Sequence, residues 1–266
     1  MEATIKDKRT KPEDVLDPDN DYAIIIKDLV KQFEDIKAVD GLNLKIEKGE
    51  LFALLGPNGA GKTTTINILC GLLPPTSGSI IVAGYDVLRD LAKVKQVIGL
   101  CPQETAAFPY LTGRENLELF GDLYSVPKDR LKERVESLLQ KLFLEEHANR
   151  RVAKYSGGLT RRISLAMALV HDPEIAFLDE PTVAMDPQSR RAVWDFIREI
   201  KQQNKTVILT THYMEEAEEL SDRVGIIDNG KLIALGSPED LKVEHNAENL
   251  EDVFIKLTGR RIREAV

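Results

Sequence analysis

The chain has 266 residues, of which 42% are hydrophobic and 30% charged, and its formal net charge at pH 7 is −8. This length exceeds a typical domain of about 150 residues but allows one α/β domain with an inserted subdomain. The acidic balance argues against nucleic acid as the main partner. Two cysteines, Cys70 and Cys101, are too few for a secreted disulfide framework, so we expect reduced core thiols. With no signal peptide and no apolar run of about 20 residues, we expect a soluble protein.

The first half of the chain predicts a tail followed by a strand-rich region. Residues 1–21 are dense in Lys, Asp, Glu and Pro without an apolar period, and we expect them to be disordered or loosely attached. The run at 50–55 is nearly continuously apolar, which is typical of a strand covered on both faces in a parallel sheet. The predicted elements are strands at 23–26, 42–46, 50–55, 79–82 and 97–101, and a helix over 61–72.

Between about 105 and 165 the pattern changes from strands to helices. Thr112 and Glu115 form a T-x-x-E capping box, and Pro127 occupies a position typical of a first helical turn. The helix after Pro127 has an apolar face made of Leu131, Val135, Leu138, Leu139 and Leu142. We therefore expect an inserted helical subdomain over about 105–165.

The last third alternates again between strands and helices. A helix is predicted to begin at Pro187, and Asn229-Gly230 is a preferred type I′ hairpin turn. Asn249 is expected to cap a terminal helix. Strands are predicted at 175–178, 207–210, 224–227 and 232–235. We expect an α/β domain over 22–245 and a C-terminal helical extension over 246–266.

A glycine-rich loop follows the predicted strand at 50–55 and opens a helix. It fits G-x-x-x-x-G-K-[ST], the pattern whose inward-pointing backbone N–H groups surround phosphate oxygens. Lys62 would reach the β- and γ-phosphates of a nucleotide, and the Thr63 hydroxyl would hold Mg²⁺. The loop by itself does not distinguish between the many P-loop enzymes. The expected phosphate contacts are Gly56, Pro57, Asn58, Gly59, Ala60, Gly61, Lys62, Thr63 and Thr64.

Two adjacent acidic residues follow the predicted strand at 175–178. Ligands of open α/β sheets lie beyond the carboxyl ends of the strands, so Asp179 is expected beside the phosphate loop. There it would hold Mg²⁺ directly or through water. Glu180 would lie next to it and take a proton from an attacking water molecule.

Further motifs follow the glycine-rich loop along the chain. Ser156-Gly157-Gly158 precedes a helix-compatible run, and Asp179-Glu180-Pro181-Thr182 follows it. These motifs resemble the signature loop and the following acidic motif of the ATP-binding cassettes of ABC transporters, and the resemblance extends over about 24–259. Four single residues also match family positions, namely Gln103 in the Q-loop, Asp186 in the D-loop, the switch histidine His212, and Phe33 as the aromatic that stacks on adenine. The order of these motifs along the chain is that of the family.

This resemblance implies a P-loop core whose parallel sheet is flanked by helices, with an antiparallel β subdomain and the helical insertion. It also implies ATP and Mg²⁺ as ligands. Catalysis would use Glu180, His212, Lys62 and Gln103, and the metal would bind Thr63, Gln103 and Asp179. Two cassettes, identical or homologous, would bind ATP head to tail, so that Ser156, Gly157 and Gly158 of one complete the phosphate site of the other.

The resemblance also implies a membrane partner. The helical insertion near Gln103 would dock a helix of a transmembrane permease subunit, which places the chain on the cytoplasmic face of the cell membrane. Three stretches, at 161–166, 211–217 and 250–259, resemble exporter-type cassettes of the drug-resistance, polysaccharide and lipid branch. We therefore expect export rather than import.

The sequence also departs from the family pattern. Tyr155 replaces the usual leucine and Leu159 the usual glutamine around Ser156, and residues 183–185 differ from the common D-loop sequence. We expect these changes to tune rates and dimer contacts rather than to abolish hydrolysis.

Three other functions fit the sequence less well. A soluble ABC ATPase of translation or DNA repair would usually carry two cassettes or a long coiled-coil insertion. A degenerate cassette that only binds ATP would lack Glu180 or His212, and both are present. A P-loop kinase would not explain Ser156-Gly157-Gly158 together with His212.

Overall fold

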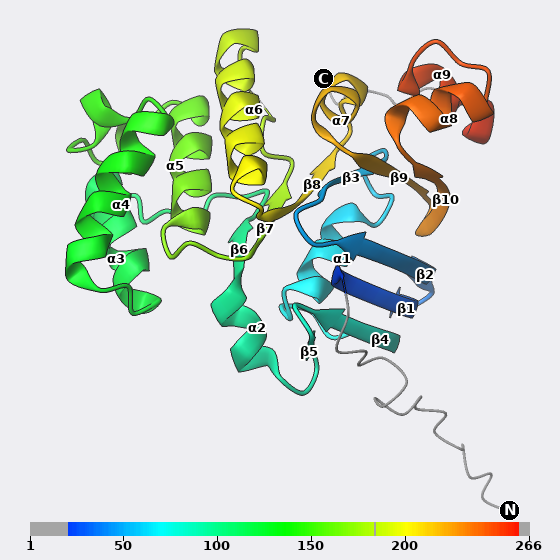
Figure 1. Ribbon diagram of the computed structural model, residues 1–266, viewed down its shortest axis with the longest axis horizontal. Helices are drawn as coiled ribbons and strands as arrows, with labels where there is room; N and C mark the ends of the chain where they lie inside the picture. The colour runs from blue at the N-terminus through cyan, green and yellow to red at the C-terminus, as the bar shows by residue number, and fades with distance from the viewer. Residues whose placement is uncertain (1–20, 184, 261–266) are drawn as a thin grey trace, which may run out of the picture.

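The computed structural model describes residues 21–183 and 185–260 and contains two β-sheets with helices between and around them (Figure 1). The smaller, antiparallel sheet has the strand order β2-β1-β4-β5. Its strands are β1 (Tyr22–Phe33), β2 (Ile36–Glu47), β4 (Ser77–Val82) and β5 (Tyr85–Asp86). Strand β1 begins at Tyr22, and the predicted tail lies almost wholly outside the described residues.

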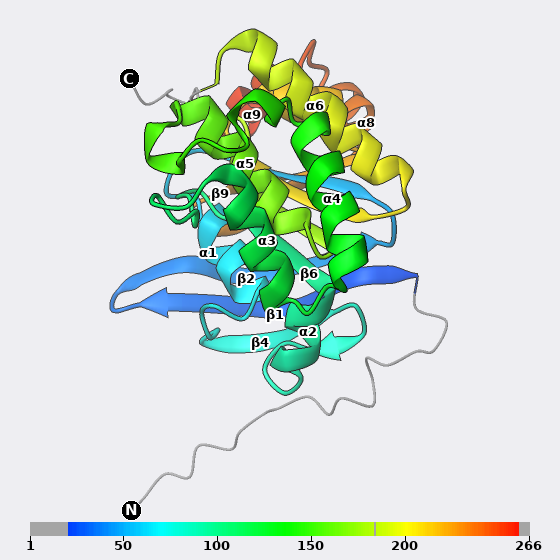
Figure 2. The same cartoon turned by 90° about the vertical axis from the view of Figure 1, so that its left-hand side faces the viewer.

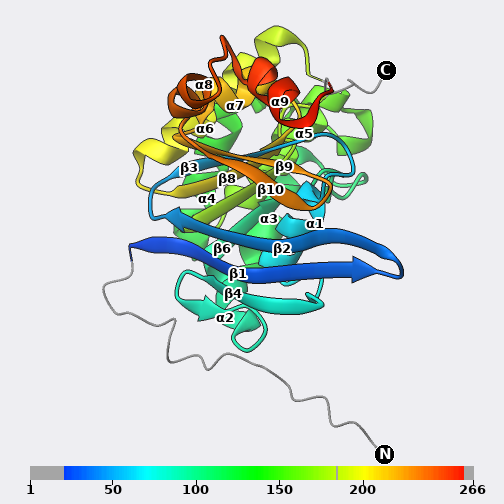
Figure 3. The ribbon, with the colours of Figure 1, turned by 90° about the vertical axis from the view of Figure 1, so that its right-hand side faces the viewer.

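The larger sheet carries the expected nucleotide loop. Its strand order is β10-β9-β3-β8-β7-β6, and all neighbours are parallel except the edge hairpin β9–β10. Its strands are β3 (Leu51–Leu55), β6 (Ile98–Cys101), β7 (Ile175–Asp179), β8 (Thr206–Thr211), β9 (Arg223–Asp228) and β10 (Lys231–Gly236). This arrangement confirms the predicted P-loop fold with a parallel sheet, and Figure 3 shows the two sheets one above the other.

The central strands are buried on both faces, which explains their continuous apolar sequences. Successive side chains of a strand point to opposite faces. On β3, Phe52 and Leu54 belong to the hydrophobic core that the smaller sheet shares with α1 (Lys62–Leu69), while Leu51 and Leu55 belong to the core on the other face. Helix α1 therefore contributes to the layer between the two sheets.

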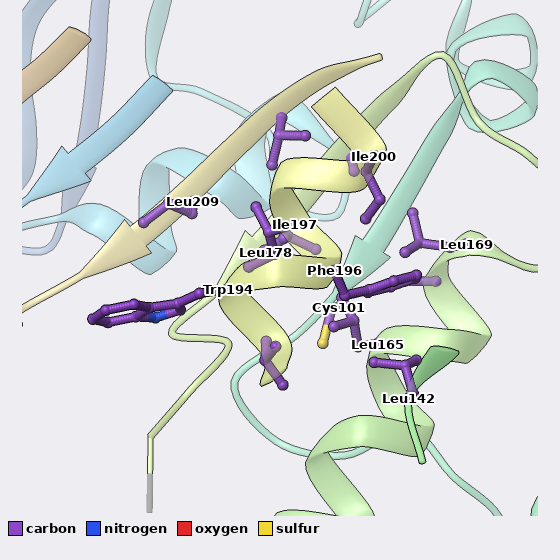
Figure 4. Close-up of a cluster of buried hydrophobic side chains, with 14 of the residues drawn as sticks. Cys101, Leu142, Leu165, Leu169, Leu178, Trp194, Phe196, Ile197, Ile200 and Leu209 are labelled. Carbon is purple, nitrogen blue, oxygen red and sulfur yellow. The ribbon is translucent and has the colours of Figure 1, made fainter. Parts of the chain in front are cut away.

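The second core lies under α5 (Gly157–Leu169) and α6 (Pro187–Gln202). Figure 4 shows Phe196, Ile197 and Ile200 of α6 beside Leu165 of α5 and Leu178 of β7. Helix α5 is buried along nearly its whole length. The residues after the predicted signature loop are thus fixed to the sheet that carries the expected catalytic acids.

The remaining helices surround this framework. Helices α3 (Gly113–Leu123) and α4 (Lys128–Lys141) lie beside α5 (Figure 2). Helix α2 (Leu91–Val97) precedes β6, and α7 (Met214–Leu220), α8 (Pro238–Glu244) and α9 (Leu250–Thr258) follow in the last part of the chain. Short 3₁₀ turns lie at Glu145–His147 and Val152–Lys154.

Local signals in the sequence placed most turns and caps correctly. Both bonds of the Thr112–Glu115 capping box are present, and Asn249 caps α9 by accepting from the Asp252 N–H. Asn229 and Gly230 both have positive φ angles, 47° and 76°, as a type I′ turn requires.

Several predicted boundaries were wrong. Helix α1 ends at Leu69 instead of residue 72, and Gly71 adopts φ 65° at a point where an added Cβ atom would lie 2.1 Å from Leu91 Cδ1. Pro127 lies at the N-cap of α4 rather than inside its first turn. Strands β1 and β2 are both longer than predicted, because their solvent-exposed ends pair with each other in a ribbon. Helices α2, α7 and α8 were not predicted.

Candidate active site

The expected phosphate loop lies between β3 and the N-terminus of α1, as its sequence predicts. Gly56 and Gly61 are required by close backbone contacts, since a Cβ atom would lie 2.3 Å from the Ile227 carbonyl oxygen at Gly56 and 2.2 Å from the Ala38 carbonyl oxygen at Gly61. Gly61 also has φ 105°, which side-chain-bearing residues rarely adopt. These close contacts with other backbone segments therefore fix the conformation of the loop.

The Lys62 ammonium is buried within this loop. Its Nζ atom donates to the carbonyl oxygens of Gly56 at 2.8 Å and Pro57 at 3.1 Å, and lies 3.3 Å from Glu180 Oε1. Burial lowers the pKa of Lys62, and the negative charge of Glu180 opposes that shift. A buried cation at a helix N-terminus is suited to bind a phosphate group.

Glu180 lies immediately beyond β7 in a strained backbone conformation. Its φ of 51° is in the left-handed region, which costs a non-glycine residue of order 1–3 kcal/mol. The Glu180 N–H donates to the carbonyl and hydroxyl oxygens of Thr210, both at 3.1 Å, and these bonds hold the conformation. The strain aims the carboxylate at Lys62 and His212.

The Glu180 carboxylate is placed between two basic side chains. Its Oε1 atom is 3.2 Å from Nδ1 of His212, in addition to the contact with Lys62. Burial would raise the pKa of Glu180, but His212 and Lys62 outweigh it, and the pKa lies below its usual value. A buried carboxylate that is kept ionised is suited to accept a proton.

Asp179, the last residue of β7, is buried and accepts a hydrogen bond from the Thr210 hydroxyl. Thr63 follows Lys62 in the first turn of α1, on the same edge of the sheet. Among the described residues no three His, Cys, Asp or Glu side chains gather into a metal cage. A hydroxyl and a carboxylate nevertheless fit Mg²⁺, which usually takes one or two protein ligands and completes its shell with phosphate oxygens and water.

The other predicted residues lie apart from this cluster. Gln103 is exposed after β6, and Phe33 is 45% exposed with the Lys31 ammonium 4.9 Å from its ring centre. Ser156 caps the N-terminus of α5 and Asp186 that of α6. Among the described residues, no hydrogen bond or ion pair joins any of these four side chains to Lys62, Asp179, Glu180 or His212.

The Ser156 loop is open to solvent. Ser156 and Gly157 are exposed, and a Cβ atom added to Gly157 or Gly158 would meet nothing within 4 Å. The N-terminus of α5 thus leaves space that none of the described residues fills. Val183 and Met185 follow Thr182 in the predicted D-loop, and the position between them lies outside the described residues.

Sequence reasoning did not identify Arg161 as a site residue. This buried side chain donates to the backbone oxygens of Asp179, Pro181, Pro102 and Gln103, and so joins α5 to the segments that carry the predicted metal ligands. The available signal was the pair Arg161 and Arg162 inside the mostly apolar 159–170 run. Thr210 was likewise assigned only to a strand.

Comparisons with known proteins agree with this geometry. Residues 39–183 match the family model described as ABC transporter. The chain is 42% identical over 240 residues to a daunorubicin resistance ATP-binding protein of Streptomyces coeruleorubidus, which covers 90% of this chain and 76% of that protein. It is 45% identical to a linearmycin resistance ATP-binding protein of Bacillus subtilis, over 85% of this chain and 72% of that one. A human phospholipid-transporting ATPase is 43% identical over 90% of this chain, which spans 14% of that protein.

Solved structures of ATP-binding subunits and cassettes superpose closely on this chain. An ATP-binding subunit of an ABC transporter matches with a TM-score of 0.82 and 26% identity, covering 89% of this chain and 99% of that one. A dimeric ATP-binding cassette in a post-hydrolysis state with ADP and phosphate matches with a TM-score of 0.75 and 27% identity, over 80% of this chain and 98% of that one.

Proposed function

We propose that this chain, which belongs to the ABC transporter family as an ATP-hydrolysing subunit that powers transport, drives export of a drug-like or lipid substrate through a separate transmembrane subunit. The similar proteins named for daunorubicin resistance, linearmycin resistance and phospholipid transport support this substrate class. Among the described residues no helix is long and apolar enough to cross a membrane.

The observation that carries the catalytic assignment is the convergence of Lys62 and His212 on one Glu180 oxygen. We propose that Glu180 accepts a proton from a water molecule as that water attacks the γ-phosphorus of ATP. The bond to the bridging oxygen breaks and ADP leaves with the electron pair. His212 would hold the γ-phosphate and orient the water with Glu180. Lys62 would neutralise the phosphate charge once its ammonium turns from the Gly56 and Pro57 oxygens.

A metal ion also has a place in this proposal. Thr63, Asp179 and Gln103 would hold Mg²⁺, which supplies positive charge to the β- and γ-phosphate oxygens when it is bound. Gln103 would also sense the γ-phosphate and pass the change on to the helical subdomain at about 105–165. Phe33 would stack on the adenine ring, for which its exposed face is available.

A second chain would complete the site. We propose a head-to-tail pair in which the open loop at Ser156, Gly157 and Gly158 faces the phosphate loop of an identical or homologous partner. The helix α5 would direct its positive N-terminal end at the γ-phosphate. Asp186 would lie at the same contact. The dimeric cassettes among the similar structures support this arrangement.

Exposed apolar side chains lie near Gln103, since Phe120 and Tyr124 line one pocket with its neighbour Pro102. Phe108, Leu123 and Tyr124 are 50%, 69% and 40% exposed, and the Phe108 ring lies 6.5 Å from that of Phe120. We define Phe108, Phe120, Leu123 and Tyr124 as the docking patch. A group of exposed apolar side chains is typical of a surface that binds another protein. We propose that a helix of the permease on the cytoplasmic face of the membrane covers this patch.

Affinity capture from detergent-solubilised membranes of the source cell, with Mg-ATP, tests the proposal. We expect a multi-span membrane protein at near-equal stoichiometry. The Leu123→Glu variant should lose that protein while it binds ATP as well as the original chain, because Leu123 lies outside the nucleotide site. Recovery of ribosomal or repair proteins without a membrane partner would instead favour a soluble ABC ATPase.

A further inference from the structure

Three segments that carry predicted catalytic or dimer-contact residues meet on one buried carboxyl group, that of Glu216. This residue of α7 is fully buried. Its Oε1 atom accepts from the Thr182 hydroxyl at 2.7 Å and from the Trp194 indole N–H at 3.0 Å. Two donors on one oxygen fix the carboxyl group in both position and orientation.

Each bond leads to a different part of the active site. Thr182 is two residues after Glu180, the proposed base. Trp194 is in α6, whose N-cap is Asp186 of the D-loop. Glu216 itself is four residues after His212. The carboxyl group thus joins the base, the dimer contact and the switch histidine through short stretches of backbone.

A second set of contacts also connects α6 with the segment that carries His212. The Arg190 guanidinium in α6 lies 5.8 Å from the Trp194 ring centre and 5.5 Å from that of Tyr213. The Tyr213 ring in turn lies 4.2 Å from the His212 ring. A displacement of His212 would therefore reach α6 by two routes, one through Tyr213 and Arg190 and one through Glu216.

The environment of Glu216 favours a hydrogen-bond acceptor over a charge. Burial raises its pKa, although Thr182 and Trp194 as donors and the charge of Arg190 act in the opposite direction. The Oε2 atom has no hydrogen-bond partner in the described part of the chain. Glutamine keeps an acceptor oxygen in the same place, whereas alanine leaves a buried hydroxyl and a buried indole N–H without one.

We propose that Glu216 is a positioning residue for ATP hydrolysis, whose acceptor oxygen keeps Glu180, His212 and the D-loop in one arrangement through Thr182 and Trp194. This role rests on the proposed catalytic functions of Glu180 and His212. It concerns the alignment of the attacking water rather than nucleotide affinity, because none of the Glu216 contacts involves the phosphate loop.

Steady-state ATPase assays of the full chain separate alignment from binding. We expect Glu216→Ala to lower kcat about 10- to 100-fold, as misplacement of catalytic groups does, and to leave KM for ATP within about threefold. Glu216→Gln should keep most of the activity. Glu215→Ala is the matched control, since Glu215 is the exposed neighbour on the same helix, and it should behave as the original chain.

Trp194 supplies a readout independent of turnover because it is the only tryptophan in the chain. We expect Mg-ATP to change its fluorescence in the original chain and in Glu216→Gln, and this response to be lost in Glu216→Ala. Far-ultraviolet circular dichroism confirms that each variant is folded. If Glu216→Ala does not fold, Thr182→Val breaks one of the two bonds alone and should also lower kcat more than it changes KM.

Particular results would overturn the proposal. A folded Glu216→Ala that hydrolyses ATP at the original rate would do so, as would one that changes only KM. A Glu216→Gln as slow as Glu216→Ala would show that charge and not the acceptor oxygen matters. If the original chain itself binds but does not hydrolyse ATP under these conditions, the proposed function fails rather than this inference, and the Trp194 response still tests the coupling.

Discussion

At the scale of single residues, the site depends on a carboxylate held in an unfavourable backbone conformation. The sequence predicts that Asp179 and Glu180 follow a buried strand, and the structure places them there. The left-handed φ of Glu180 could not be predicted, because it is stabilised by Thr210 from a strand 30 residues away in sequence. Local patterns report which side chains are present, whereas their orientation depends on contacts between distant segments.

Glu180→Gln tests the proposed base. Glutamine keeps the size of the side chain but cannot accept the proton, so we expect ATP turnover to fall about 10²- to 10⁴-fold. ATP should still bind and hold two chains together, which size-exclusion chromatography with light scattering can detect in the presence of Mg-ATP. A variant that stays monomeric where the original chain dimerises, or that hydrolyses ATP at the original rate, would contradict the assignment.

Tyr155 replaces the family's usual leucine, and the structure gives its hydroxyl a partner. The Tyr155 Oη atom donates to the His147 carbonyl oxygen at 2.6 Å, and a Cβ at Gly113 would lie 2.4 Å from it. Tyr155→Phe should lower the free energy of unfolding by about 1 kcal/mol, the usual net value of one hydrogen bond. Urea denaturation measures this. ATPase activity should be unchanged, and a large loss of activity would assign Tyr155 a role in the dimer contact instead.

At the scale of elements, regular patterns were predictable and short elements were not. Helices α4 and α6 have long apolar stripes, so their positions were predicted from sequence. Helices α2, α7 and α8 have seven residues each and one to three buried side chains, which leaves too little periodicity to recognise. The buried position of Glu216 was not predicted for this reason. Its helix is rich in acidic residues, and the sequence alone does not distinguish a buried carboxylate from a solvated one.

Arg161 shows how one side chain fixes the relation between elements. Its planar group donates to backbone oxygens at the C-terminal ends of two neighbouring strands. These are Asp179 and Pro181 at and after the end of β7, and Pro102 and Gln103 after β6. Arginine suits this position because its donors spread in several directions, whereas lysine has a single ammonium.

Arg161→Lys should therefore be destabilising although the charge is kept. We expect the free energy of unfolding to fall by about 2–3 kcal/mol, because at least one carbonyl oxygen loses a charged donor. Thermal unfolding monitored by circular dichroism measures the effect. Arg191→Lys is the control, since Arg191 is exposed on α6. Equal stability of the two variants would mean that the Arg161 bonds contribute little.

At the scale of the whole molecule, the phosphate loop and the Ser156 loop lie on separate elements of one chain. Gly61 belongs to the β3–α1 junction, while Ser156 precedes α5 beyond the helices α3 and α4. The sequence predicted both loops, and the resemblance supplied the idea that they meet between chains. The fold of one chain explains the positions of the two loops, and in the proposed head-to-tail pair they meet only when a second chain is present.

Mixed dimers test this arrangement directly. Lys62→Ala should remove the phosphate contact of one half-site, and Ser156→Arg should block the other, so each variant alone is expected to be inactive. A head-to-tail pair of one Lys62→Ala chain and one Ser156→Arg chain has both defects in one site and none in the other. Because half of randomly mixed pairs are of this kind and each has one intact site of two, mixing should restore about a quarter of the original turnover. No recovery, despite mixed dimers detected by a two-tag pull-down, would place the two loops in the same chain's site or require both sites to act together.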